Sequence, residues 1–306
     1  MVDIREEQSG QRVDNFLLTR LKGVPRSHVY RLLRTGQVRV NMKRIKPTYR
    51  LQTGDMVRVP PVRTAQRQAS GAPGKGMLQA LEHATLYEDP ELLILDKPSG
   101  MAVHGGSGVS FGVIEGLRAL RPDAAYLELV HRLDRDTSGC LMIAKKRSEL
   151  RRLHRLLRRG DSDKRYMALV KGCWQGGRRG IDAPLFKNVL RSGERLVRVS
   201  ENGKASLSIF EPVEIFADAS LMEITLKTGR THQIRVHAGH IEYPVAGDLK
   251  YGSDEFNRQM QQRGLKRLFL HAASLEFVVP DTNKRVRVQA PLDKALETVL
   301  KKLRYA

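Results

Sequence analysis

The first part of the chain alternates between helical and extended hydrophobic patterns. One group of apolar residues returns every three or four positions, as on one face of a helix, at Val13, Phe16, Leu17 and Leu21. After the breakers at residues 23–25, we expect Ser27 to cap a second helix, which Gly36 ends. The apolar positions of that helix are Val29, Tyr30, Leu32 and Leu33. Residues 38–41 and 56–59 are expected to be short strands, which gives a small helix–helix–strand module.

The hydrophobic pattern then stops over residues 64–76, where small, polar and helix-breaking residues dominate (TAQRQASGAPGKG). Such a composition is typical of a linker. We therefore expect a first domain over residues 1–62, a linker over residues 63–83 and a larger domain over residues 84–306.

Apolar runs of strand length and segments of helical periodicity alternate through the larger domain. Strands are expected at residues 92–95, 140–144, 166–170, 205–210, 221–226, 268–270 and 286–289. Helices are expected at residues 113–121, 148–159, 231–240 and 292–303. The alternation lacks the regular rhythm of a doubly wound parallel sheet, so we expect an α+β fold with a central mixed or antiparallel sheet.

The charge of the chain indicates a polyanionic partner. Lys and Arg total 54 against 33 Asp and Glu, a net charge of +21, and nucleic acid is the first candidate for such an excess. Residues 1–62 hold 13 Lys or Arg against 5 Asp or Glu, a net charge of +8. We expect Arg26, Arg31 and Arg34, on or beside the second helix, to face the phosphates of a nucleic acid. The alternative is a basic helix that only faces solvent.

A second basic segment covers residues 145–165, with 10 Lys or Arg against 3 acids. Its leucines can face the core at helical spacing while its arginines remain outside. This surface is either solvated or in contact with RNA, and a steep loss of binding with added salt would favour RNA.

The compartment is expected to be reducing and cytoplasmic. The two cysteines, Cys140 and Cys173, form no CxxC pair and no disulfide framework. The first residues show no signal-peptide pattern, and the longest apolar runs, such as residues 92–95, are too short to span a membrane.

Candidate chemistry is concentrated in residues 129–144, LVHRLDRDTSGCLMIA. Two apolar runs flank a turn that holds two carboxylates, two arginines and a histidine. A turn fixed between core strands is a rigid place for reacting groups. On composition alone, a charged hairpin with internal salt bridges is an equally good interpretation.

Two parts of the chain resemble known families. The run from residue 12 to residue 59, with RSHVYRLLRTGQVRVN at its centre, resembles the S4-like RNA-binding domain. Residues 131–139, HRLDRDTSG, resemble the H-R-L-D-x-x-T-S-G signature of the RluA-type pseudouridine synthases. Further segments are similar to this family in the same order, at residues 96–100, 164–170, 228–237 and 269–272. Asp96 stands where the family often has Asn.

The resemblance implies roles for individual residues. It places the family's catalytic aspartate on Asp134, its active-site tyrosine on Tyr166 and its active-site arginine on Arg235. Arg132 matches the arginine that enters the space left by a flipped nucleotide. Contacts to RNA are also expected from three further residues of these motifs, His131, Arg230 and His232.

The implied reaction converts uridine to pseudouridine. It breaks the bond between the ribose anomeric carbon and the base nitrogen, turns the base, and joins it again through ring carbon 5. No cofactor and no metal is expected, since the reaction is neither a redox reaction nor a hydrolysis. One carboxylate beside the sugar suffices, either as a nucleophile or as a base on the adjacent ribose position. Neither a phosphate-binding loop at residues 105–108 nor a metal site at His237 and His240 is favoured.

Residues 104–116 and 192–200 resemble a branch of this family that modifies several uridines of 23S ribosomal RNA. We therefore expect 23S ribosomal RNA or a large-subunit assembly intermediate as the partner, no membrane, and a monomeric enzyme. Two alternatives stay open: a non-catalytic RNA-binding or ribosome-assembly factor, and a glycosylase that uses Asp134 with Asp136. Retention of all three residues Asp134, Tyr166 and Arg235 argues against the first, and release of free uracil would support the second.

Overall fold

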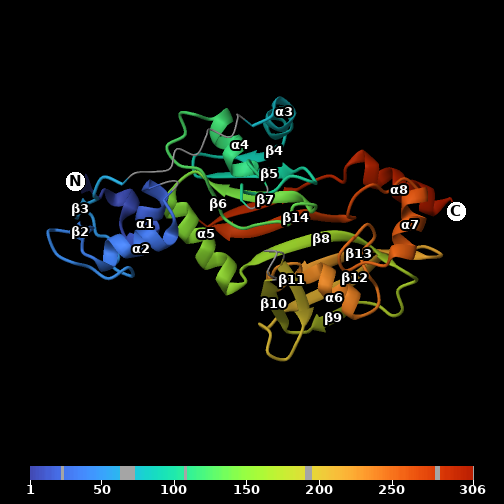
Figure 1. The fold of residues 1–306 in the computed structure, drawn as a ribbon. Helices are drawn as coiled ribbons and strands as arrows, with labels where there is room; N and C mark the ends of the chain where they lie inside the picture. Colours follow the sequence, from blue (N-terminus) through green and yellow to red (C-terminus); the bar gives the residue numbers. More distant parts are fainter. Residues whose placement is uncertain (22–23, 63–72, 107–108, 190–194, 280–282, 306) are drawn as a thin grey trace. The chain divides into compact units, whose positions relative to one another are not determined.

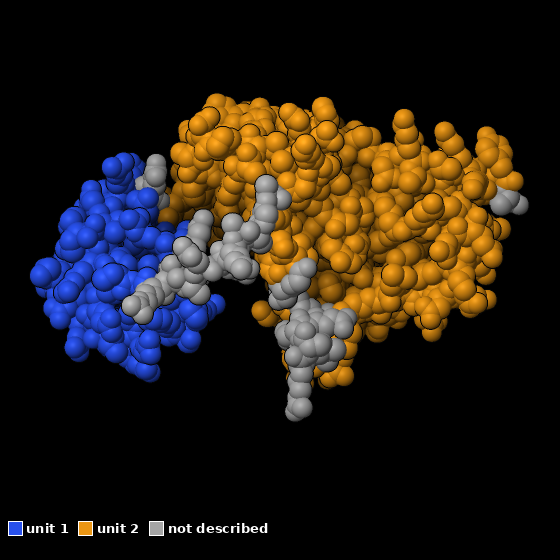
Figure 2. Space-filling view, turned by 45° about the horizontal axis from the view of Figure 1, so that its top comes forward, with its two compact units in different colours: residues 1–72 blue, residues 73–306 orange. Residues whose placement is uncertain are grey.

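The fold was analysed in a computed structural model of the chain, which describes residues 1–21, 24–62, 73–106, 109–189, 195–279 and 283–305 (Figure 1). The chain forms two compact units, residues 1–72 and residues 73–306, coloured separately in Figure 2. The first part of the expected linker, residues 63–72, and parts of the segments 104–116 and 192–200 lie outside the described residues.

The first unit is a small three-stranded sheet with two helices. Its sheet has the order β1-β3-β2, and both neighbouring pairs are antiparallel. The elements are β1 (Val2–Asp3), a 3-10 turn (Glu6–Gln8), α1 (Val13–Arg20), α2 (Arg26–Arg34), β2 (Arg39–Val40) and β3 (Met56–Arg58). The apolar residues predicted on the two helices, among them Val13, Leu17 and Val29, are buried together.

One detail of the predicted second helix is wrong. The N-cap of α2 is Pro25, and Ser27 lies inside the helix. The proline ring fixes φ near the value that a chain entering a helix needs, and the observed φ of −55° agrees with this. The helix therefore begins before the serine that the polar-cap rule favours.

The second unit is built on one large mixed sheet. Among the described residues, ten strands join this sheet, with the order β4-β5-β7-β14-β8-β13-β12-β9 along its main path, while β15 pairs with β14 and β6 with β7. The strands are β4 (Thr85–Glu88), β5 (Leu92–Lys97), β6 (Glu128–Leu129), β7 (Ser138–Ala144), β8 (Ser162–Lys171), β9 (Arg179–Asp182), β12 (Leu207–Ile215), β13 (Ala219–Leu226), β14 (Leu270–Val279) and β15 (Lys284–Gln289). Neighbours are antiparallel except for a short parallel pairing of β7 with β14, and β10 (Leu185–Val189) and β11 (Arg195–Val199) form a separate hairpin. The predicted α+β class with a mixed sheet is confirmed.

Helices cover this sheet and close its ends. They are α3 (Lys75–Glu82), α4 (Val113–Leu120), α5 (Arg147–Arg159), α6 (Gln233–His240), α7 (Asp254–Gln262) and α8 (Lys294–Arg304). In Figure 1, α5 runs beside the sheet, and it contacts β7 and β14. None of the helices in the described ranges is long and apolar enough to cross a membrane.

Helix α3 shows that the last part of the predicted linker is structured. It falls within residues 63–83, which we expected to be a linker throughout. Leu81 is buried in the main core, and Leu81 and Met77 both contact Gly116 of α4 closely. Two apolar residues four positions apart thus give this short segment a packed helical face, so its end belongs to the second unit.

Three central strands place the candidate site. The main core contains the inner faces of β5, β7, β8 and β14. β14 lies between β7 and β8 near the centre of the sheet. The turn before β7 and the middle of β8 therefore lie close to each other. Helix α6 follows β13 and brings its first turn to the same place.

Candidate active site

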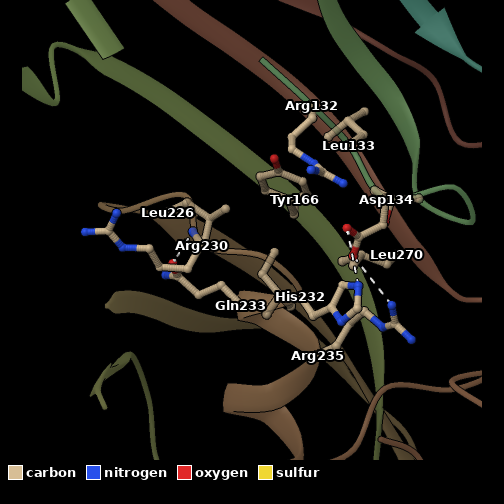
Figure 3. Close-up of a pocket in the computed structure, with 12 residues that line it drawn as sticks. Arg132, Leu133, Asp134, Tyr166, Leu226, Arg230, His232, Gln233, Arg235 and Leu270 are labelled. Atoms are coloured by element: carbon tan, nitrogen blue, oxygen red, sulfur yellow. Dashed lines mark hydrogen bonds and ion pairs between the residues drawn. The ribbon is translucent and has the colours of Figure 1, made fainter. Parts of the chain in front are cut away.

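A pocket of twelve lining residues lies where these elements meet (Figure 3). The loop between β6 and β7 supplies Arg132, Leu133, Asp134 and Thr137. The sheet supplies Tyr166, Leu226 and Leu270, and the loop and first turn of α6 supply Arg230, His232, Gln233, Ile234 and Arg235. Asp134 is the one carboxylate among these lining residues.

Asp134 lies in a rigid hairpin. The hairpin joins β6 to β7, with Leu129 paired to Ile143, and the Thr137 N–H donates to the Asp134 carbonyl at 3.2 Å. Gly139 follows the turn with a φ of +102°, and a Cβ there would lie 2.3 Å from the carbonyl oxygen of Ala272. Only glycine fits this position, because both the backbone angle and the close approach of β14 exclude a side chain.

His131 fixes the same hairpin from inside. Its Nε2 accepts a hydrogen bond from the Met142 N–H at 3.1 Å. Burial, helped by the positive charge of Lys164, lowers the pKa of His131 to about 4, so the ring is neutral and able to accept. His131 is not among the pocket-lining residues, and its contact with RNA stays a prediction.

Two nitrogen-bearing side chains face the Asp134 carboxylate. Arg235 Nη1 lies 3.5 Å from Oδ2, and His232 Nε2 lies 3.8 Å from Oδ1. Figure 3 shows both side chains pointing to the carboxylate from the α6 side. The side chain of Asp134 keeps 19% of its surface exposed, so it is reachable from the pocket.

Asp248 holds Arg235 in this position. Its carboxylate accepts from Arg235 Nε at 2.7 Å and from Nη2 at 2.8 Å, which leaves Nη1 directed at Asp134. The backbone N–H groups of Lys250 and Tyr251 donate to the same carboxylate. Burial alone would raise the pKa of Asp248, but the hydrogen bonds and charge of Arg235 lower it below its ordinary value.

Tyr251 completes the support of this corner. Its ring lies 5.1 Å from the Arg235 guanidinium carbon, and its hydroxyl lies 2.8 Å from His232 Nδ1. The Tyr251 oxygen accepts from the Val197 N–H, so its own proton is available to Nδ1. When Tyr251 donates to Nδ1, the neutral ring carries its proton on Nε2, the nitrogen nearer Asp134.

Burial sets the protonation states of the pocket. It lowers the pKa of His232, against the opposing charge of Asp134, so the ring is neutral at neutral pH. It raises the pKa of the Tyr166 hydroxyl, and the charge of Asp134 raises it further, so Tyr166 keeps its proton. The positive charge beside Asp134 therefore comes from Arg235.

The loop before α6 is fixed by Gln233. Its Oε1 accepts from the Thr228 hydroxyl and the Arg230 N–H, and its Nε2 donates to the Leu207 carbonyl and the Ser208 hydroxyl, all within 2.8–3.1 Å. The buried amide thus satisfies the loop backbone and ties it to β12. The residues Arg230 and His232 are held at the pocket in this way.

Lys97 holds the Asp134 hairpin from behind. It is fully buried, and its Nζ donates to the carbonyl oxygens of Pro98, Met101 and Arg135 at 2.7, 2.8 and 2.9 Å. Ser99 adds a hydrogen bond to the Asp136 carbonyl at 2.7 Å. Two loops distant in sequence, residues 98–101 and 134–137, are joined through one ammonium group.

Replacing Lys97 should therefore cost considerable stability. Lys97→Met leaves three buried carbonyl groups without their donor, and we expect a loss of about 3 kcal/mol. For a unit of this size that lowers Tm by roughly 8 °C. Thermal unfolding followed by circular dichroism measures it, with Lys146→Met as the control, because Lys146 is half exposed and pairs with Glu91 at the surface. Equal Tm values for the two variants would contradict the assigned role.

The structure brings six predicted site residues together. Asp134, Tyr166, Arg235, Arg132, Arg230 and His232 all line the pocket. The predicted residues of the first unit form a separate surface: Arg31 and Arg34 line a groove with Arg44 and Lys46, and Arg26 lies 5.8 Å from the centre of the Tyr30 ring. No group of three or more potential metal ligands occurs within the described ranges.

Sequence reasoning missed Asp248, Tyr251 and Lys97 as parts of the site. Lys97 stood inside a recognised motif without a role. Asp248 and Tyr251 belong to the segment GDLKYG, residues 247–252, which follows α6 closely. A carboxylate in a glycine-flanked turn after the arginine-bearing helix was the signal that could have identified them.

Known proteins share both the sequence and the fold of this chain. Residues 91–240 match the RNA pseudouridylate synthase family, and residues 11–57 match the S4 domain. The ribosomal large subunit pseudouridine synthase C of Escherichia coli (strain K12) is 56% identical over 309 residues, covering 100% of this chain and 97% of that protein. The protein of the same name from Haemophilus influenzae is 55% identical over 305 residues, covering 99% and 95%.

Solved structures agree at the level of the fold. Human RNA pseudouridylate synthase domain containing 4 aligns with a TM-score of 0.62 at 23% identity, covering 75% of this chain and 96% of that one. Human RNA pseudouridylate synthase domain containing 1 aligns with a TM-score of 0.58 at 24% identity, covering 76% and 98%. The expected family and the S4 domain are both confirmed. This chain belongs to the RNA pseudouridylate synthase family, in the RluA-type group that its motifs resemble, with an S4 domain before the synthase domain.

Proposed function

We propose that this enzyme converts several uridines of 23S ribosomal RNA to pseudouridine, with Asp134 as the catalytic carboxylate. The observation that carries the proposal is the single carboxylate of the pocket, which faces one fixed guanidinium and shares the pocket with one buried tyrosine. The full-length relatives named for the large ribosomal subunit support the choice of RNA.

Asp134 acts on the ribose of the target nucleotide. Its carboxylate either attacks the anomeric carbon or removes the proton of the adjacent ribose position, and the bond to the base nitrogen breaks. The base turns and rejoins through carbon 5, which loses a proton while the former bonding nitrogen gains one. A primary isotope effect from deuterium at the ribose 2′ carbon would identify the base role, and its absence the nucleophile role.

Arg235 and His232 keep the carboxylate in one place. Asp248 occupies two nitrogens of Arg235, so the guanidinium is directed at Asp134 and is not free to rotate away. A preorganised positive charge in a partly buried site stabilises the carboxylate without reorganisation during the reaction.

Tyr166 is suited to bind the base. Its ring forms a wall of the pocket and offers a flat surface on which uracil can stack. Because its hydroxyl keeps its proton, it can also donate a hydrogen bond to the uracil. A phenolate at this position would require the deprotonation that burial opposes.

Arg132 is placed to keep the target nucleotide out of its stack. It is exposed and lies at the pocket beside Asp134 (Figure 3). Flipping a base costs a few kcal/mol, and a guanidinium that fills the vacated space offsets part of this.

The S4 domain supplies affinity through RNA phosphates. Arg31→Gln with Arg34→Gln should weaken RNA binding and lower the slope of log Kd against log salt by about 1.5, as expected when about two phosphate contacts are lost. The kcat at saturating RNA should stay unchanged. The control is Arg20→Gln with Arg58→Gln, two exposed residues outside the Arg31 groove. If the control lowers the slope equally, the groove has no special role.

We expect the enzyme to act as a monomer in the cytoplasm, on 23S ribosomal RNA or on a large-subunit assembly intermediate. The test is pseudouridine mapping of total RNA from cells with and without this protein. Loss of specific sites in 23S ribosomal RNA is the expected result. Unchanged maps would leave the non-catalytic alternative, and release of free uracil from RNA would indicate a glycosylase.

A further inference from the structure

Helix α5 exposes a row of arginines that the reaction described above does not use. Four exposed residues share one side of the helix, Arg151, Arg155, Arg158 and Arg159, here called the α5 arginine face. At 3.6 residues per turn they span roughly 100° of the helix and about 12 Å of its length. The opposite side carries Leu153 and Leu156, which are buried in the main core.

The charge of this face is not balanced from within the helix. Glu149 is the only acidic residue of α5 in the sequence, and it is buried on the far side, where Arg152 donates to it at 2.7 Å. Like charges at helical spacing destabilise a helix. Concentrating arginines on this face therefore works against the stability of α5, which fits a surface that serves binding.

Two further arginines, one of α5 and one of α4, lie near an aromatic side chain beside the face. The charges of Arg147 and Arg118 lie near the half-buried Tyr126, and Arg118 also pairs with Glu128 at 3.1 Å. The pKa of the Tyr126 hydroxyl is raised by burial and by Glu128, while the nearby arginine charges oppose the rise. Proteins often bind nucleic acid with such a combination, because the aromatic ring stacks on bases and the guanidinium groups contact phosphates.

Helix α5 contacts the chain segment that leads to the candidate active site. His154 of α5 lies with its Nε2 3.0 Å from the Val130 carbonyl, one residue before His131. Val130 directly follows β6, at the start of the loop that carries Asp134. Helix α5 therefore packs against the start of the segment that carries Asp134.

We propose that the α5 arginine face binds the phosphate backbone of the RNA that flanks the target uridine. The proposal rests on the proposed function and extends it to a second RNA site on the synthase domain. All six basic residues of α5 are arginine and none is lysine, and guanidinium is the group that binds phosphate through two parallel hydrogen bonds. A few successive phosphates of one strand match the length of the face.

The test uses the full-length protein and two synthetic hairpin RNAs. Both carry the same uridine-containing loop, and one stem is longer by about one helical turn. For the long hairpin, Arg155→Gln with Arg158→Gln should raise Kd about tenfold and lower the salt slope by about 1.5, as for two lost phosphates. Fluorescence anisotropy measures both. Binding of the short hairpin should change little, and kcat at saturating RNA should stay the same.

A matched control separates local from general charge. Arg285→Gln with Arg287→Gln removes the same charge from β15, where both arginines are exposed and pair with Glu276. Arg155→Lys with Arg158→Lys keeps the charge and should restore the salt slope. Equal behaviour of the α5 and β15 variants would overturn the proposal, as would an equal loss on both hairpins. If the wild-type protein makes no pseudouridine in either hairpin, the proposed function fails while the binding data still decide the role of α5.

Discussion

Asp134→Asn is expected to bind RNA with the affinity of the wild-type protein and to form no pseudouridine. The amide keeps the size of the side chain but can neither attack the anomeric carbon nor take up a proton. Removing a group of this kind costs on the order of 10⁴-fold or more in kcat. RNA affinity should hold, because most of it comes from phosphate contacts elsewhere on the chain. The measurements are Kd by fluorescence anisotropy and pseudouridine by mass spectrometry of digested RNA.

The neighbouring Asp136→Asn variant is the matched control. Asp136 is two residues away, is partly exposed and pairs with Arg135. It is not among the twelve residues of the pocket in Figure 3, although it lines the wider cleft that also contains Asp134. It should keep most of the activity. Substantial turnover by Asp134→Asn would refute the assignment, and inactivity of both variants would favour a two-carboxylate reaction.

Asp248→Asn is expected to lower kcat about a hundredfold with little change in RNA affinity. The amide cannot accept from both Arg235 nitrogens, and its own N–H group would face the guanidinium. Arg235 then loses the orientation that directs Nη1 at Asp134, and a small displacement near a reacting group costs about this factor. Asp248 does not line the pocket, so the RNA surface itself is unchanged.

Steady-state kinetics and a binding measurement separate this effect from unfolding. Asp218→Asn is the control, since Asp218 forms an ion pair of the same 2.7 Å length with Arg263, more exposed and outside the pocket. It should leave kcat unchanged. A variant of Asp248 that lost affinity and Tm but kept kcat would show a purely structural residue.

The parts of the fold that the sequence predicts well are those with strong local patterns. Strands β5 and β7 and helices α4 and α5 fall within a few residues of the expected ranges, because long apolar runs and clear helical periodicity leave few alternatives. Strands β9, β10 and β11 and helix α7 were not predicted. The segments of β9 and α7 are mostly polar, and β9 pairs with the later strand β12. β10 and β11 pair with each other but lack a regular alternation of apolar and polar residues.

For the site, the motifs indicate the proposed reacting residues but not the residues that hold them in position. Asp134, Tyr166 and Arg235 come from three motifs, and only the sheet order makes them neighbours. Asp248 shows why the supporting residues of the site could not be predicted from the sequence. Its ion pair with Arg235 depends on the path of the chain after α6, which no hydrophobic period encodes. Lys97 likewise has a role only once two loops lie around it.

Strand β14 joins the two halves of the large sheet, because it lies between β7 and β8. It begins at Leu270, which itself lines the pocket, and it follows every other residue of the pocket in the sequence. During translation, the reactive side chains are therefore synthesised before the strand that unites them, and before the pocket can assemble. A chain that ends before β14 contains these side chains but lacks the strand that brings them together.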